Sequence, residues 1–292
     1  MGITAWDLGA ILDKALLYGS TLTAAGAVMF LLYAGSVPAT TIERRIRRRV
    51  ALLLGVVLLV ALLRLPLTVG AMTGEFSGVF APTLTGMVWR AGEGRALQLR
   101  LAGIALMAIG LVAQRCLLLL GLPGALLAAV SFAALGHTHA TGAGPVPMVL
   151  IAAHLVCVAF WLGGLMCLWA IAADATAPEL GRAAQRFGAG AVCVGALLVA
   201  SGLPVLWSFV RPLSEFWTSP YGRGLGIKMG LVAGLLGAAA INKLMLTPRL
   251  RANDRAAVRW LRRSMGVEIV LAVAILLTTA TVTSLFGPVH SD

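Results

Sequence analysis

Charged residues are scarce in this sequence, and acidic residues are the scarcest. Asp and Glu number 11 and Lys and Arg 23 among 292 residues, so only 12% of the chain is charged, whereas 60% is hydrophobic. The apolar residues form repeated runs of about 20, the length that an α-helix needs to cross a bilayer. The sequence therefore predicts an all-α, polytopic membrane protein rather than a set of soluble domains.

Catalytic motifs are missing as well. The chain has no Walker phosphate loop, no Cys-x-x-Cys pair, no His-Glu-x-x-His motif and no serine nucleophile elbow. An ATP-driven pump or a hydrolase thus has no visible machinery, and we predict that the protein is not an enzyme.

The cysteines show no framework spacing. Cys157, Cys167 and Cys193 fall inside apolar runs, and Cys116 lies near the end of one. None of them is placed for a structural disulfide, so the cysteines do not indicate a redox compartment.

Basic residues lie between the apolar runs. This placement makes them topology signals rather than a nucleic-acid-binding surface, although the formal net charge is +12. The runs predict eight spans, at about 15–35, 50–70, 97–114, 118–136, 147–172, 187–209, 225–246 and 265–286. Gly121 and Pro123 interrupt the fourth. Asp7 and Asp13 stand where a cleavable signal has a basic region, so we expect the first span to be retained.

Two arginine clusters set the expected orientation. The first cluster is Arg44, Arg45, Arg47, Arg48 and Arg49, after the first span, and the second is Arg249, Arg251, Arg255, Arg259, Arg262 and Arg263, after the seventh. With eight spans both clusters lie on one side, which the positive-inside rule makes cytoplasmic. Both termini then face outward, into the periplasm if the membrane is a bacterial inner membrane.

The chain contains a weak internal repeat. Arg48 and Pro66 are separated like Arg186 and Pro204, and GRALQLR at 94–100 is similar to GRGLGIK at 222–228. A duplication would give two parallel halves of four spans, as in some transporters. We place the halves at 1–140 and 141–292.

All four histidines fall on the outer side of the predicted topology. His137 and His139 follow the fourth span, His290 follows the eighth, and His154 lies seven residues into the fifth span. At 1.5 Å per residue, His154 is roughly 10 Å below the outer end of its helix. A histidine inside a membrane span is a functional-site hypothesis by default.

Sulfur ligands accompany the histidines. Met148 lies at the outer end of the fifth span, and Cys157 lies one turn below His154. Imidazole binds several transition metals, while thioether and thiol groups favour Cu(I). The candidate metal ligands are His154, His137, His139, His290, Met148 and Cys157. The alternatives are ordinary loop positions for the two loop histidines, packing roles for the sulfur residues, and a backbone carbonyl partner for His154.

Further polar and small residues lie along the spans. Trp161, two turns below His154, either lines a cavity floor or packs, and Gly163 and Gly164 allow another helix to approach closely. Arg64 and Lys228, near outer span ends, are expected to snorkel outward.

Two polar residues lie near the inner ends of later spans. Asn242 is expected to hydrogen-bond across helices. Glu268 lies close to Arg262 and Arg263 in the sequence, which suggests an ion pair at the inner surface.

One arrangement resembles a known family. The pattern H-x6-W-x-G-G, formed by His154, Trp161, Gly163 and Gly164, opens a four-span segment and resembles the copper resistance protein D family. The later landmarks in the same order are Tyr221-Gly222-Arg223, Lys228, Asn242-Lys243, Pro248, Ser264 and Glu268. The resemblance is best over about 148–287, and the first half fits the family's eight-span layout more loosely.

The resemblance implies an inner-membrane protein that handles copper and moves it from the periplasm towards the cytoplasm. The implied partner is a small periplasmic copper-binding protein, in addition to the membrane lipid. Two rival hypotheses stay open. One is a haem-binding electron-transfer protein, with His137 or His139 and His154 as axial ligands. The other is an assembly or sensing protein that holds copper without moving it.

Overall fold

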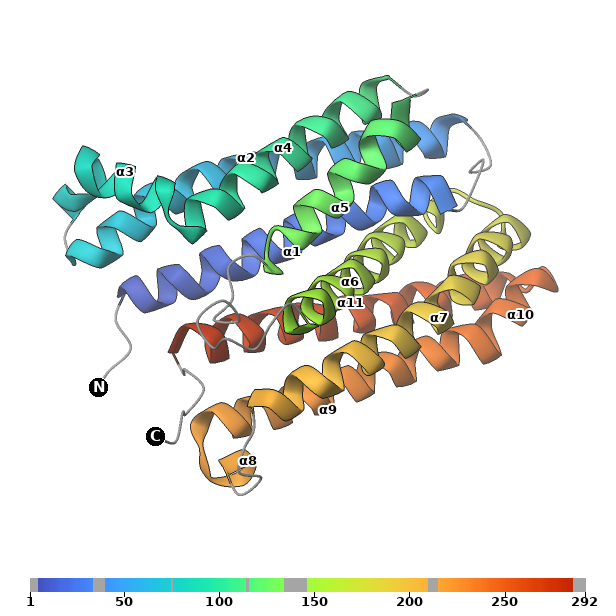
Figure 1. Cartoon of the computed structure of the whole chain (residues 1–292). Coiled ribbons are helices and arrows are strands. Elements are labelled where there is room, and N and C mark those ends of the chain that lie inside the picture. The colour runs from blue at the N-terminus through green and yellow to red at the C-terminus, as the bar shows by residue number, and fades with distance from the viewer. Residues whose placement is uncertain are drawn as a thin grey trace.

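The computed structural model describes residues 5–33, 40–74, 76–113, 116–133, 146–209 and 215–285, which form a bundle of long helices (Figure 1). In chain order the elements are α1 (Ala5–Tyr33), α2 (Thr40–Thr73), the 3₁₀ helix η1 (Phe76–Phe80), α3 (Pro82–Arg90), α4 (Gly92–Val112), the π-helical η3 (Leu117–Gly121), α5 (Leu122–Val130), α6 (Val146–Ile171), α7 (Ala177–Phe209), α8 (Glu215–Thr218), α9 (Pro220–Ile241), the π-helical η6 (Asn242–Leu246), α10 (Thr247–Arg251) and α11 (Arg255–Leu285). Backbone groups in lipid must be satisfied within the chain, and helices meet that demand locally.

Seven helices in the described ranges are long and apolar enough to cross a membrane. They are α1, α2 from Ile42, α4, α6, α7 as far as Pro204, the continuous run from α9 through α10, and α11. Over the described residues, the prediction of a helical protein with helices suited to crossing a membrane is therefore confirmed. The fourth predicted span corresponds to a shorter apolar helix, Leu119–Val130. Eight spans remain a prediction, because 134–145 lie outside the described residues.

Both arginine clusters lie at one end of the bundle, where α2 and α11 begin, and the start of α1 and the end of α11 lie at the other (Figure 1). The arginines were expected in loops but are helical, because arginine is a good helix former and the helices continue past their apolar parts. Arg45 pairs there with Asp174, in the connection between α6 and α7. The orientation of the bundle in a membrane, and the division into halves at 140, remain predictions.

A short turn between α10 and α11 carries a second ion pair at this end. The carboxylate of Asp254 accepts hydrogen bonds from Arg249 Nε at 2.9 Å and from the Ala256 backbone N–H at 2.8 Å. The Arg249 hydrogen bond, followed by the backbone bond, holds the pKa of Asp254 below its ordinary value. The carboxylate therefore stays ionised at the start of α11, where it caps the helix.

Helices α1 and α6 meet backbone to backbone. A Cβ built on Gly26 of α1 would overlap the carbonyl oxygen of Ala159, and one on Gly163 of α6 would overlap the backbone nitrogen of Ala27. Only glycine fits at these two positions, as at the close helix contacts typical of membrane proteins. The adjacent Gly164 lies against the ring of Phe187 on α7. The centre of the bundle is thus α6, with α1 on one side and α7 on another.

Candidate functional site

The ring of His154 rests against α7. Its Nδ1 lies 3.3 Å from the carbonyl oxygen of Leu198, and a Cβ at Gly202 would lie 3.3 Å from its Cε1. When Nδ1 carries the proton and donates to that carbonyl, Nε2 keeps its lone pair, the arrangement usual in metal-binding histidines. No described residue hydrogen-bonds to Nε2. The carbonyl partner considered from the sequence is therefore present, and one ring nitrogen is still available.

The other proposed ligands are only partly placed. Met148 is half-buried on α6 and packs against the core, and Cys157 is buried one turn below His154. Within the described ranges, no three His, Cys, Asp or Glu side chains come together as a metal-binding group. His137, His139 and His290 lie outside the described residues. The outer copper ligands and the haem alternative, both of which need these residues, stay predictions.

Lys228 of α9 is close enough to interact electrostatically with His154. From the sequence we expect this lysine near an outer helix end, but its proximity to the histidine is not predicted. A neighbouring ammonium group weakens the binding of any cation at the imidazole.

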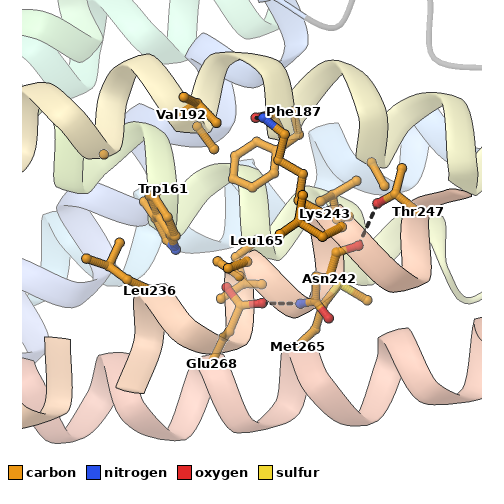
Figure 2. Close-up of a pocket in the computed structure, with 18 of the residues that line it drawn as sticks. Trp161, Leu165, Phe187, Val192, Leu236, Asn242, Lys243, Thr247, Met265 and Glu268 are labelled. Atoms are coloured by element: carbon orange, nitrogen blue, oxygen red, sulfur yellow. Dashed lines mark hydrogen bonds between the residues drawn. The ribbon is translucent and has the colours of Figure 1, made fainter. Parts of the chain in front are cut away.

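A cavity of about 760 Å³ opens deeper in the bundle, between α6, α7, α11 and the run from α9 to α10 (Figure 2). Most of its wall is apolar, with Leu165, Phe187 and Leu236 among the lining side chains. Trp161, for which the sequence left both lining and packing open, also lines it, whereas His154 is not among the lining residues.

The polar part of this wall is a carboxyl–amide pair. Glu268 is 3% exposed, and its Oε1 accepts a hydrogen bond from Nδ2 of Asn242. Asn242 begins the π-helical turn η6, and its own carbonyl accepts a hydrogen bond of 2.8 Å from the Thr247 hydroxyl. Such π-turns occur frequently at functional sites. Asn242 does therefore bond across helices, to α11.

The suggested ion pair of Glu268 with the nearby arginines is wrong. The Arg262 guanidinium lies 5.7 Å from the ring centre of Trp169, and that of Arg263 lies 5.3 Å from the ring centre of Trp260. Residues five and six positions apart on a helix point in different directions, so Glu268 faces the cavity while these arginines do not.

Two buried atoms in the cavity wall have no hydrogen-bond partner in the described part of the chain. They are Nε1 of Trp161 and Oδ1 of Asn242. The indole nitrogen points toward the carboxyl group of Glu268 (Figure 2). The nearby Lys243 donates instead to the carbonyl of Gly188, at 3.2 Å. The site thus places an indole N–H donor and an unpartnered amide oxygen beside a buried acid.

A second polar cluster joins α1, α2 and α4. Arg64 pairs with Asp13, and its Nη2 lies 2.7 Å from Oε1 of Glu93. The expectation that Arg64 snorkels outward is wrong, because two carboxylates hold it inside the bundle. Next to them, Arg100 is 1% exposed with its guanidinium carbon 4.0 Å from the ring centre of Phe132. These contacts could not be predicted from the sequence, because they depend on which helices are neighbours.

Comparisons with known proteins agree on one family. The protein-family model described as copper resistance protein D matches residues 181–282, and the family model of the copper resistance protein D-like N-terminal domain matches residues 5–146. A copper transport protein of Bacillus subtilis (strain 168), CutJ, is 24% identical over 305 aligned positions, which cover 98% of this chain and 54% of CutJ. The chain therefore spans about half the length of the curated relative that it matches. No solved structure matches the chain.

The two matched ranges leave residues 147–180 between them. That stretch contains His154, Trp161 and the glycine pair, which form the H-x6-W-x-G-G pattern of the sequence resemblance. The later landmarks, from Tyr221 to Glu268, fall inside the second matched range.

Proposed function

Since the chain belongs to the copper resistance protein D family, we propose that it transports copper across a bacterial inner membrane, from the periplasm towards the cytoplasm. Two features support this proposal: a relative whose name is copper transport protein, and seven helices within the described residues that are suited to crossing a membrane. Both arginine clusters lie at one end of the bundle, which suits a cytoplasmic face there and periplasmic termini.

The observation that carries the transport route is the unpartnered Nε2 of His154 inside a membrane helix. Nδ1 is engaged by the Leu198 carbonyl, so the ring is oriented and its second nitrogen is free to bind copper. Cys157 and Met148 on the same helix are the sulfur ligands that we assign to the ion as it passes. His137, His139 and His290 would receive copper at the outer surface from a small periplasmic copper-binding protein.

The Lys228 ammonium near His154 suits transit rather than storage. Conduction needs a site that attracts the ion enough to enter and holds it weakly enough to leave. A positive charge close to the imidazole lowers the affinity for a cation, so copper would bind briefly and move on.

The test is copper accumulation in cells that produce the wild type or the His154→Ala variant. Removal of the oriented imidazole is expected to reduce accumulation to the level of cells without the protein. Cys193→Ser is the matched control, because Cys193 is exposed and is not a proposed ligand. Immunoblotting of membranes checks that all variants are present in equal amounts. Equal accumulation in wild type and His154→Ala would remove His154 from the route.

Purified protein in vesicles separates transport from copper holding. A transporter delivers Cu(I) to a chelating dye inside the vesicle, whereas a holding protein binds the metal and delivers none. Uptake that depends on His154 supports the proposal, and binding without uptake contradicts it.

A further inference from the structure

Glu268, which is buried, has no cationic partner among the described residues, unlike the partly buried acids Asp13 and Glu93. Asp13 and Glu93 share Arg64, whereas no described ion pair includes Glu268. Its polar neighbours are the amide of Asn242 and the indole of Trp161. It lies 13 residues into α11, about 20 Å from the start of that helix, and near its middle.

The basic groups around the cavity are engaged elsewhere or lie toward helix ends. Lys243 of η6 donates to the Gly188 carbonyl, and Arg262 and Arg263 of α11 lie over tryptophan rings. The other basic residues on the lining helices lie toward helix ends: Arg182 and Arg186 near the start of α7, Arg223 and Lys228 near the start of α9, Arg249 and Arg251 in α10, and Arg255 and Arg259 at the start of α11. α6 contributes no Asp, Glu, Lys or Arg at all.

A lone carboxylate is costly in such a place. Moving an ionised carboxyl group out of water costs several kcal/mol unless a cation compensates it, and a neutral amide and an indole N–H compensate only in part. Protonation removes most of that cost. Burial therefore favours the neutral acid while no cation is nearby, and an arriving cation favours the ionised form.

The cavity wall also offers groups that a cation could use. Oδ1 of Asn242 is buried and without a partner, and Met265, which is 1% exposed, lines the same cavity with its thioether side chain. Carboxylate and amide oxygens accept a metal cation, and thioether sulfur favours Cu(I). The donor set therefore combines an exchangeable proton with two kinds of oxygen ligand and one thioether ligand for a metal ion.

We propose that Glu268 is a proton-exchange site at which an entering Cu(I) ion replaces the proton of the carboxyl group. The carboxyl O–H bond breaks, the electron pair stays on oxygen and binds the metal, and the proton leaves to water on the cytoplasmic side. No electron is transferred. The identity of the cation rests on the proposed copper transport; the protonated acid does not.

The first measurement concerns the metal-free protein and requires no transport. It compares the infrared spectra of the metal-free wild type and Glu268→Gln at neutral pH. The wild type should show the carbonyl stretch of a protonated carboxylic acid, and Glu268→Gln should lack it. Glu268→Asp keeps an acid in the site and should keep a protonated band. Loss of the band in wild type, or its persistence in Glu268→Gln, overturns the proposal even if copper is transported.

The second measurement counts protons. Wild type, titrated in a weak buffer with Cu(I), or with Ag(I) as a substitute that undergoes no redox change, should release one more proton per bound ion than Glu268→Gln. The matched control is Glu179→Gln, which removes a carboxylate that bonds Thr176 at the start of α7 and should behave like wild type. Equal proton release in wild type and Glu268→Gln overturns the exchange step.

Uptake by vesicles separates the two proposals. If wild type carries Cu(I) at a rate that depends on pH and Glu268→Gln carries it without that dependence, both stand. If the two carry it with the same pH dependence, transport stands and proton exchange falls. If wild type carries none, transport falls, and the infrared band alone decides the state of Glu268.

Discussion

Two polar clusters between the helices of this bundle differ in how charge is compensated. In the first, two carboxylates of different helices converge on Arg64, with Arg100 stacked on Phe132 beside them. In the second, Glu268 has an amide and an indole for neighbours and faces a cavity of about 760 Å³. Both lie within helices suited to a membrane, where ionised groups are expensive.

The difference in charge compensation separates the Arg64 cluster, which is a structural arrangement, from the Glu268 site, which can change its protonation state. The Arg64 cluster is nearly neutral when all its members are ionised, so it can remain ionised and hold α1, α2 and α4 together. Glu268 has no compensating charge, so its favourable state depends on what occupies the cavity. Acidic residues inside one membrane protein can thus have different roles, and the role depends on whether a cationic side chain is paired with the acid.

Removal of the central arginine should produce the largest effect. Arg64→Leu leaves Asp13 and Glu93 as unpaired, partly buried carboxylates, and we expect a loss of about 3 kcal/mol in the free energy of unfolding. An SDS titration of the purified protein measures this. Lys243→Leu is the corresponding change beside Glu268 and should cost less than about 1 kcal/mol, because Lys243 only meets the Gly188 carbonyl. Equal losses in the two variants would contradict the comparison.

Neutralising one acid in each cluster should have an intermediate effect and sharpen the contrast. Asp13→Asn removes a charged hydrogen bond to Arg64 and should cost about 1.5 kcal/mol. Glu268→Gln replaces a neutral acid with a neutral amide of the same size, so the change should stay within about 0.5 kcal/mol. The same titration applies to both. A large loss in Glu268→Gln would indicate that the acid is ionised in the folded protein.

An exposed pair provides the smallest effect. Arg249→Ala breaks the contact with Asp254, which lies 2.8 Å from Arg249 Nη2 at the end of the bundle. Exposed ion pairs contribute little, since water solvates both partners well. The melting temperature in detergent should not change measurably. A clear drop would show that this turn supports the start of α11 more than its exposure suggests.

The sequence predicted the helical, membrane-spanning class because each apolar run marks its own helix. The sequence also indicates the orientation of Glu268, because the helical period places Arg262 and Arg263 on other faces of the same helix. An ion pair with these arginines is therefore not expected from the helical period.

Other contacts could not be predicted from local pattern. The pairing of Arg64 with Asp13 joins residues 51 positions apart, and it follows from which helices pack together. The position of Asn242 depends on a π-helical turn, which hydrophobic periodicity does not reveal. The ligand role of His154 and its partners stays a prediction, because the histidines outside its helix lie beyond the described residues.

The contact between Gly26 and Gly163 also limits how the bundle can move. Two backbones in direct contact have no side-chain layer to rearrange between them, so α1 and α6 cannot slide past each other without opening a gap along their length. This contact therefore acts as a fixed pivot. If copper passes beside α6, any movement of that helix has to carry α1 with it.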